Sequence, residues 1–392
     1  MRALIVALLL LAAEVRAQSV DNPHAHLALA VLYDLAGYSQ DRTNVNQVGD
    51  LATNAHVRTD RVMLDGAFKV PVAWQYTLAL DYNGVRSGSR PAFTINDLVF
   101  TFPIGQGVDL AIGRQKEGVT SEVMATTRTL ALTERPTALT SIFPARSDGI
   151  RLMGGQPANG RWSVGWFNRH PLASGPTPAG GNDFAGRVFF ARGGATDEKS
   201  GDKSHDSTAV VHLGATAAWS GAVNDSLRFR AKPEVNSAPN FVDTKSFPSH
   251  GAATLGLDAL AQRRNVSLIS EVLVTRASVV HRAPGTFLGY YAEASWRPTG
   301  EPRGYDASRG TFGRVKQRAQ RGAFEVGARF SHTDLSSGTL DGGVFDRVSG
   351  VASWYSRWST RLDVGYGFGT LTRDGATGRT HFFIMRAQWE LL

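Results

Sequence analysis

The chain has 392 residues, a formal charge of +8, 42 glycines and no cysteine. This length fits two or three soluble domains or one large β-barrel, and the lack of cysteine excludes disulfides and thiolate metal sites. The basic charge is compatible with nucleic acid, an anionic membrane surface or small anions, but no zinc-finger, helix-turn-helix or RNA-recognition pattern accompanies it, so no nucleic-acid partner is expected.

The first residues have the features of an exported precursor. Arg2 precedes an apolar run at residues 4–13 that is too short to span a membrane, and Val15-Arg16-Ala17 is similar to a signal cleavage site. We therefore predict a removed signal peptide at 1–17. Residues 18–56, with a strand-like stretch at 27–33, are predicted to form an N-terminal periplasmic or first-strand segment.

From residue 57 onward, segments of eight to twelve residues alternate between apolar and polar side chains, as tilted membrane strands do. One clear example sets Leu362, Val364, Tyr366 and Phe368 against Arg361, Asp363, Gly365 and Gly367. A soluble β-sandwich alternates too. Two details favour a membrane barrel: aromatic residues near strand ends on the apolar face, and charged residues beside glycines on the polar face, which suits a wet lumen.

We predict an all-β fold for residues 57–392, a transmembrane antiparallel β-barrel of about 16 strands with an inward-folded constriction loop. Sixteen strands leave about 23 residues for each strand and its connection, and 14 or 18 strands fit nearly as well. Three long segments interrupt the strand rhythm. They are 117–139, which either folds inward or lies on the surface, 170–183, and 299–322, which carries six basic and two acidic residues.

A basic row stands out at residues 227–232, where Arg228, Arg230 and Lys232 occupy every second position. Side chains at alternate positions of a strand point to one face, about 7 Å apart along the chain. Three cations in a row require anions or water opposite them. The row is therefore either a solvated face or part of an anion path.

Ten short motifs, in this order and spacing, resemble the phosphate-selective porin O and P family of Gram-negative outer membranes. The resemblance extends over about residues 57–391, and the motifs are VRTDRV (57–62), INDL (95–98), LAIGRQK (110–116), LTERP (132–136), RSDGI (146–150), RFRAKPE (228–234), FVDT (241–244), TGE (299–301), FGRVK (312–316) and GAFEVGAR (322–329).

This resemblance implies a trimeric 16-stranded channel that attracts phosphate-like anions through basic groups in its lumen. Carried over by position, the lumen residues are Arg58, Arg61, Arg228, Arg230 and Lys232, with Asp97 as an acidic lumen residue. The constriction loop, at about 114–138, contributes Arg114, Lys116, Arg128 and Arg135. The mouth or constriction also contains Arg314, Lys316 and Arg318. A series of moderate positive sites replaces the hydration of a permeating anion and still lets it leave.

The sequence departs from the family pattern in two places. Glu117, Glu122 and Glu134 fall in the predicted constriction loop, where phosphate-selective members are more basic. At the C-terminus, Leu391 stands where an aromatic residue is expected, and Leu392 follows it.

Other functions receive less support from the residues. The ten histidines, His212 among them, show no nucleophile or metal-ligand spacing, and glycine pairs such as Gly180-Gly181 lack the lysine and helix of a phosphate loop. We therefore predict a non-enzymatic porin for passive diffusion of small phosphate-like anions, without cofactor or metal, in outer-membrane lipid and lipopolysaccharide. A weakly selective general porin and a closed structural barrel are the alternatives.

Overall fold

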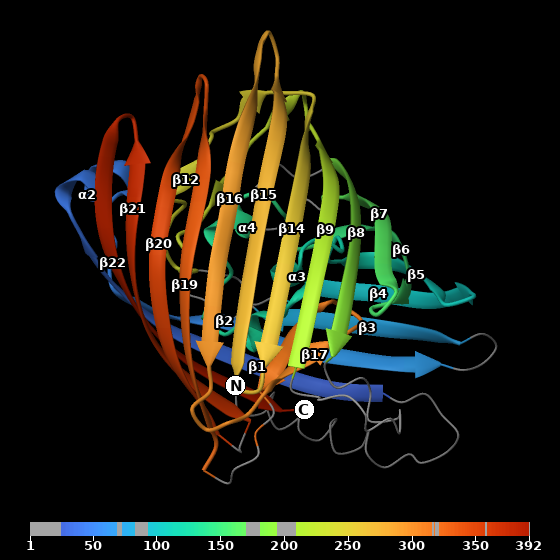
Figure 1. Cartoon of the computed structure of the whole chain (residues 1–392). Helices are drawn as coiled ribbons and strands as arrows, with labels where there is room; N and C mark the ends of the chain where they lie inside the picture. The colour runs from blue at the N-terminus through green and yellow to red at the C-terminus, as the bar shows by residue number, and fades with distance from the viewer. Residues whose placement is uncertain are drawn as a thin grey trace.

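The computed structural model describes residues 25–68, 73–82, 93–169, 181–193, 209–315, 317, 321–356 and 359–391. Sixteen antiparallel strands of these residues form one closed barrel, which confirms the predicted all-β barrel and its strand number (Figure 1). The predicted signal peptide, 1–17, lies outside the described residues. Within the described part of the chain, no helix is long and apolar enough to cross a membrane.

The barrel strands follow one another around the wall in chain order. They are β1 (Ala25–Gln40), β2 (Asn54–Phe68), β3 (Trp74–Tyr82), β4 (Phe93–Gly105), β5 (Val108–Gln115), β6 (Ser147–Gln156), β7 (Gly160–Asn168), β8 (Asn182–Gly193), β9 (Ala209–Gly221), β14 (Gly251–Arg263), β15 (Val266–Val279), β16 (Arg282–Trp296), β19 (Ala323–Ser337), β20 (Leu340–Tyr355), β21 (Thr360–Arg373) and β22 (Ala376–Leu391).

The barrel closes between its first and last strands. β1 pairs with β22 from Leu29 opposite Leu391 to Gln40 opposite Thr380. The barrel therefore includes β1, which precedes residue 57, and the described part of the segment 18–56 contributes a full strand. The short helix α2 (Arg42–Val48) follows β1, and Asp41 caps it by accepting a hydrogen bond from the Asn44 backbone N–H at 2.7 Å.

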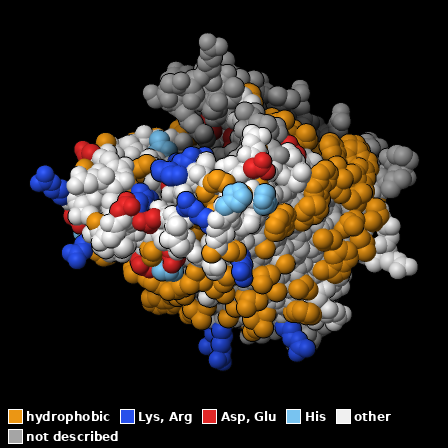
Figure 2. Space-filling model, turned by 90° about the horizontal axis from the view of Figure 1, so that it is seen from above, with side chains coloured by type: hydrophobic (Ala, Val, Ile, Leu, Met, Phe, Trp, Pro, Cys, Tyr) orange, Lys and Arg blue, Asp and Glu red, His pale blue; other side chains and the backbone are white. Residues whose placement is uncertain are grey.

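The strands place apolar side chains outside and polar side chains inside. On β14, Leu255 and Leu257 are 66% and 61% exposed, whereas Thr254 and Asp258 are buried toward the lumen. On β21, Leu362 and Val364 face outward while Arg361 and Asp363 are buried inside. Figure 2 shows hydrophobic side chains spread over the outer wall and charged ones gathered around the rim. An apolar outer band is what contact with lipid requires.

Three connections fold into the barrel, and they are named here by their residues. The 116–146 loop contains α3 (Ser121–Met124), the 3₁₀ turn η1 (Thr127–Thr129) and α4 (Thr137–Thr140). The 222–250 loop contains β10 (Ser226–Leu227), β11 (Arg230–Ala231), β12 (Val242–Asp243) and β13 (Phe247–Pro248). The 297–322 connection contains the hairpin of β17 (Arg303–Asp306) and β18 (Thr311–Val315).

Contacts with inward-facing wall residues hold the 116–146 loop inside the barrel. Arg361 of β21 donates to the Leu130 carbonyl at 2.6 Å, and Arg329 of β19 donates to the Glu134 carbonyl at 2.8 Å. Gly289 of β16 lies directly against α4, since a Cβ there would come within 3.0 Å of the Ala138 Cβ. The predicted inward-folded segment is thus enclosed by the wall, with α3 and α4 visible inside the barrel in Figure 1.

The basic row at 227–232 differs from its prediction as a continuous strand. The segment belongs to the 222–250 loop and forms only two-residue strands, β10 and β11, which pair with β13 and β12. The alternation reflects packing inside the barrel, because Leu227, Phe229 and Ala231 are buried in the apolar cluster under the wall. Phe229 contacts Phe287 of β16, with ring centroids 5.4 Å apart.

Candidate functional site

A cavity of about 440 Å³ lies between β2, the 116–146 loop and the 222–250 loop. Five cationic side chains and two carboxylates line it: Arg58, Arg135, Arg146, Arg230, Lys232, Glu134 and Glu234. Apolar residues such as Val123, Leu139 and Phe143 form the remaining wall. A polar cavity with an excess of positive charge is suited to bind a small anion.

Several of these charges neutralise one another. Glu134 accepts from Arg58 Nε at 2.6 Å and from Arg386 Nη2 of β22 at 2.7 Å. Arg146 donates from Nε to Asp97 of β4 at 2.7 Å. Asp97 therefore neutralises an arginine at the cavity edge and is not a free lumen carboxylate.

The second carboxylate, Glu234, is also neutralised. It accepts from Arg329 Nη2 of β19 at 2.6 Å and from the Ser331 hydroxyl at 2.6 Å. Both carboxylates of the cavity are thus directed toward wall arginines.

Three cations of the cavity have no carboxylate within 4 Å among the described residues: Arg135, Arg230 and Lys232. Arg135 donates to the backbone carbonyls of Glu122, at 3.0 Å, and Ala125. Lys232 donates to the Asn236 carbonyl. Carbonyl groups orient Arg135 and Lys232 without cancelling their charge. Together with Arg230, these two cations form the core of the candidate site.

Burial changes the protonation of the lysines near this site. Burial lowers the pKa of Lys232 from its usual value, and the positive charge of Arg58 lowers it further, while Glu134 opposes the shift. Lys116 does not line the cavity; its ammonium donates to the Met124 carbonyl at 2.9 Å and to the Ala125 carbonyl. Burial, together with Arg135 and Arg146, holds the pKa of Lys116 well below its usual value.

These shifts predict that anion preference declines at pH values below the ordinary lysine value. Lys232 is charged at low pH and loses its proton below the ordinary lysine value of 10.5, so the positive field weakens as pH rises toward that value. Reversal potentials under a salt gradient, recorded from pH 7 upward, measure this decline. Lys232→Gln should flatten the profile, and an identical profile in that variant would contradict the prediction.

The other predicted lumen cations lie apart from this cavity. Arg61 pairs with Asp81 at 2.5 Å, Arg114 with Asp148 at 3.4 Å, and Arg228 with Asp243 at 2.8 Å. The structure thus brings three predicted lumen residues, Arg58, Arg230 and Lys232, together with Arg135 of the predicted constriction loop. Lys316 and Arg318 lie outside the described residues.

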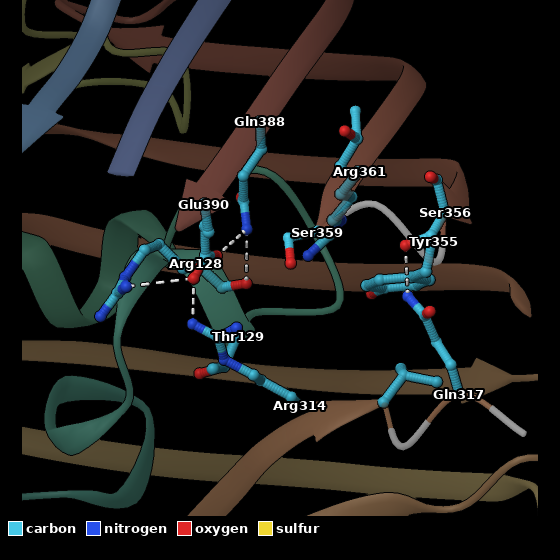
Figure 3. Close-up of a pocket in the computed structure, with 12 residues that line it drawn as sticks. Arg128, Thr129, Arg314, Gln317, Tyr355, Ser356, Ser359, Arg361, Gln388 and Glu390 are labelled. Carbon is cyan, nitrogen blue, oxygen red and sulfur yellow. Dashed lines mark hydrogen bonds and ion pairs between the residues drawn. The ribbon is translucent and has the colours of Figure 1, made fainter. Parts of the chain in front are cut away.

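Arg128 and Arg314 meet in a second cavity, of about 270 Å³ (Figure 3). Both arginines form ion pairs with Glu390 of β22, Arg128 at 3.1 Å. Figure 3 shows Gln388 beside Glu390, and Arg361, Tyr355 and Gln317 across the cavity.

Sequence reasoning missed the residues that form ion pairs with the cavity side chains. Arg146 lies in a family motif, but its pairing with Asp97 depends on the folded loop. Arg386 and Glu390 occupy alternate inward positions of the last strand, and this period of two was the signal that could have identified them as lumen residues. The sequence carries no signal for their partners.

The histidine at the lumen wall has a structural role. His212 Nε2 contacts Asp258 Oδ2 at 2.8 Å, and Nδ1 contacts the Tyr305 hydroxyl at 2.6 Å, so both ring nitrogens are engaged. Among the described residues, no group of three or more His, Asp or Glu side chains is placed to hold a metal ion.

Comparisons with known proteins agree with this architecture. A family model described as phosphate-selective porin O and P matches residues 33–391. Over 176 residues the chain is 28% identical to an uncharacterized protein of Caulobacter vibrioides. That match covers 43% of this chain and 35% of the relative, so it extends over only about a third of that protein.

Solved structures with the same fold cover nearly the whole chain. An anion-selective porin from Comamonas acidovorans aligns with a TM-score of 0.58 at 12% identity, covering 94% of this chain and 100% of its own. The outer membrane channel DcaP of Acinetobacter baumannii gives 0.56 at 9% identity, with 95% and 99% covered. The trimer form of OmpT of Vibrio cholerae gives 0.55 at 11% identity, with 95% and 100% covered. At these identities the likeness concerns the fold.

Proposed function

The chain belongs to the phosphate-selective porin O and P family and is an outer-membrane porin, and we propose that it carries small anions by passive diffusion, with phosphate-like oxyanions preferred. The family and the barrel fold indicate a channel and not an enzyme. We further propose that the chain works as a homotrimer in outer-membrane lipid and lipopolysaccharide, after removal of residues 1–17. The trimer form of OmpT supports the trimeric part of this proposal.

The observation that carries the proposal is the 440 Å³ cavity with three cations that have no carboxylate partner among the residues that the structure describes. Arg135 and Arg230 offer planar forks that match oxyanion oxygens, and Lys232 offers a compact charge. An anion that enters a narrow lumen loses part of its hydration shell, and these groups replace it. Because each is a moderate site, the anion can also leave.

Two acidic residues of the 116–146 loop, Glu134 and Glu117, interact with groups other than the three cations of the cavity core. Glu134 is bound by two arginines, and Glu117 accepts from the Ser147 hydroxyl at 2.6 Å inside the wall. Burial, with Asp183 nearby, holds the pKa of Glu117 well above its usual value. Two of the three glutamates that depart from the family pattern are therefore compatible with anion preference.

A matched pair of arginines tests the proposal. Arg230 lines the cavity, whereas Arg228, two residues earlier, pairs with Asp243 and does not line it. In planar bilayers, chloride current should show an anion-signed reversal potential and should be blocked by phosphate. Arg230→Gln should weaken phosphate block by about tenfold, the usual value of one charge-assisted hydrogen bond. Arg228→Gln should have a much smaller effect.

The alternatives have distinct outcomes in the same recordings. Equal phosphate block in wild type and Arg230→Gln, with an unselective or cation-signed current, would identify a general porin. No current from folded protein would identify a closed barrel, for which the three segments inside the lumen provide the structural reason.

A further inference from the structure

Glu390 connects three separate parts of the molecule. It lies on β22, the closing strand, and accepts from Arg128 Nη1 of the 116–146 loop at 3.1 Å. It also pairs with Arg314 Nη2 at the β18 end of the 297–322 connection. The side chain of Glu390 is 4% exposed, whereas that of Arg314 is 41% exposed. The carboxylate therefore holds two guanidinium groups that reach it from different inserted segments.

In the second cavity, Arg128 and Arg314 share one carboxylate as their counter-charge. Among the described residues that line its 270 Å³, Glu390 is the only carboxylate. Arg361, which also lines the cavity, is already paired with Asp363 at 2.6 Å and donates to the Leu130 carbonyl. Gln388 Nε2 donates to Glu390 Oε1 at 2.5 Å, which fixes the carboxylate on the side away from the arginines (Figure 3).

We propose that Glu390 is an internal counter-ion that determines selectivity in this cavity, occupying the place where two guanidinium groups would otherwise bind a permeating oxyanion. The proposal rests on the channel function proposed above. The chemistry of recognition is that of carboxylate or phosphate between guanidinium forks. Because Glu390 is tethered, its effective concentration exceeds that of a free anion, and the cavity binds anions weakly.

The two cavities therefore differ in whether their cations are neutralised by a carboxylate. In the 440 Å³ cavity, Arg135, Arg230 and Lys232 have no carboxylate partner within 4 Å among the described residues. In the 270 Å³ cavity, at the end of β22 next to Leu391, the cations are held by an acid of the chain itself. An anion leaves a weak site readily, which conduction requires.

Glu390→Gln tests the proposal, since glutamine keeps the size of the side chain and one acceptor oxygen but removes its charge. We expect the chloride-to-potassium permeability ratio, from reversal potentials under a KCl gradient, to rise by more than about twofold. Asp374→Asn, which makes the same charge change in the exposed turn at the other end of β22, should leave the ratio unchanged. Arg128→Gln added to Glu390→Gln should return the ratio toward that of wild type.

A second variant tests the proposal even if Glu390→Gln does not fold. Gln388→Glu adds a carboxylate beside Glu390 and should lower the permeability ratio. A ratio equal to wild type in either folded variant would overturn the proposal. A wild-type channel without anion preference would refute the proposed function, but the two variants would still shift the ratio in opposite directions if Glu390 acts as inferred.

Phosphate binding provides a readout that needs no current. Calorimetric titration of the detergent-solubilised protein with inorganic phosphate should detect additional binding in Glu390→Gln that is missing in wild type and in Asp374→Asn. If the barrel conducts no ions, the titration alone tests the role of Glu390. Identical phosphate binding by the three proteins would then overturn the inference.

Discussion

Replacing Arg386 by glutamine is expected to lower the free energy of unfolding by about 3–5 kcal/mol, the usual cost of removing one partner from a buried ion pair. Arg386 donates to both oxygens of Asp34, at 2.6 and 2.7 Å, and also to Glu134. Asp34 lies on β1 and Arg386 on β22, so the pair joins the two strands that close the barrel. Without the arginine, the fully buried Asp34 carboxylate loses its cationic partner among the described residues, and Glu134 loses one of two.

Denaturant unfolding in lipid vesicles measures this effect. Arg379→Gln is the matched control, because Arg379 lies on the same strand with an exposed side chain and should change stability by less than about 0.5 kcal/mol. Equal unfolding midpoints for the two variants would show that the closing strands do not depend on the ion pair.

Replacing residues 299–321 by a short turn is expected to raise single-channel conductance by more than about twofold, because the β17–β18 hairpin occupies lumen space. The hairpin contacts the wall through Tyr305 and His212, and Gly310 accepts from the Ser121 hydroxyl at 2.5 Å, so it lies between β9 and the 116–146 loop. The barrel should stay closed, since β16 pairs directly with β19.

Heat-modifiable electrophoretic mobility checks that this deletion variant folds. Conductance in symmetric salt then measures the open cross-section. A folded variant with wild-type conductance would place the narrowest point elsewhere, at the 116–146 and 222–250 loops.

The prediction of the barrel from sequence succeeded because a strand in a membrane wall obeys a local rule. Each outward side chain meets lipid and each inward one meets water or polar groups, so the period of two appears along every strand, as in Leu362 to Phe368. The strand β1 was only partly recognised, although its burial pattern alternates, and its pairing with β22 joins residues about 350 positions apart.

The basic row at 227–232 shows where a local pattern misleads. Its alternation is real, but it arises from Leu227 and Phe229 packing under the wall and not from a membrane strand. A period of two reports only that one face of a segment is apolar. Whether that face meets lipid or the interior of the barrel depends on where the segment lies.

The sequence by itself determined the barrel class, the strand periodicity, the interruption of the strands at about 117–139 and the excess of cations, but left open whether that segment folds inward. Tertiary structure alone decided which cations remain uncompensated. Arg61, Arg114 and Arg228 are paired with aspartates, whereas Arg230 and Lys232 have no carboxylate partner in the described part of the chain, and nothing in their neighbouring residues distinguishes them. The physical reason is that ion pairing acts over a few ångströms of space, and the partners come from strands and loops far apart in the chain.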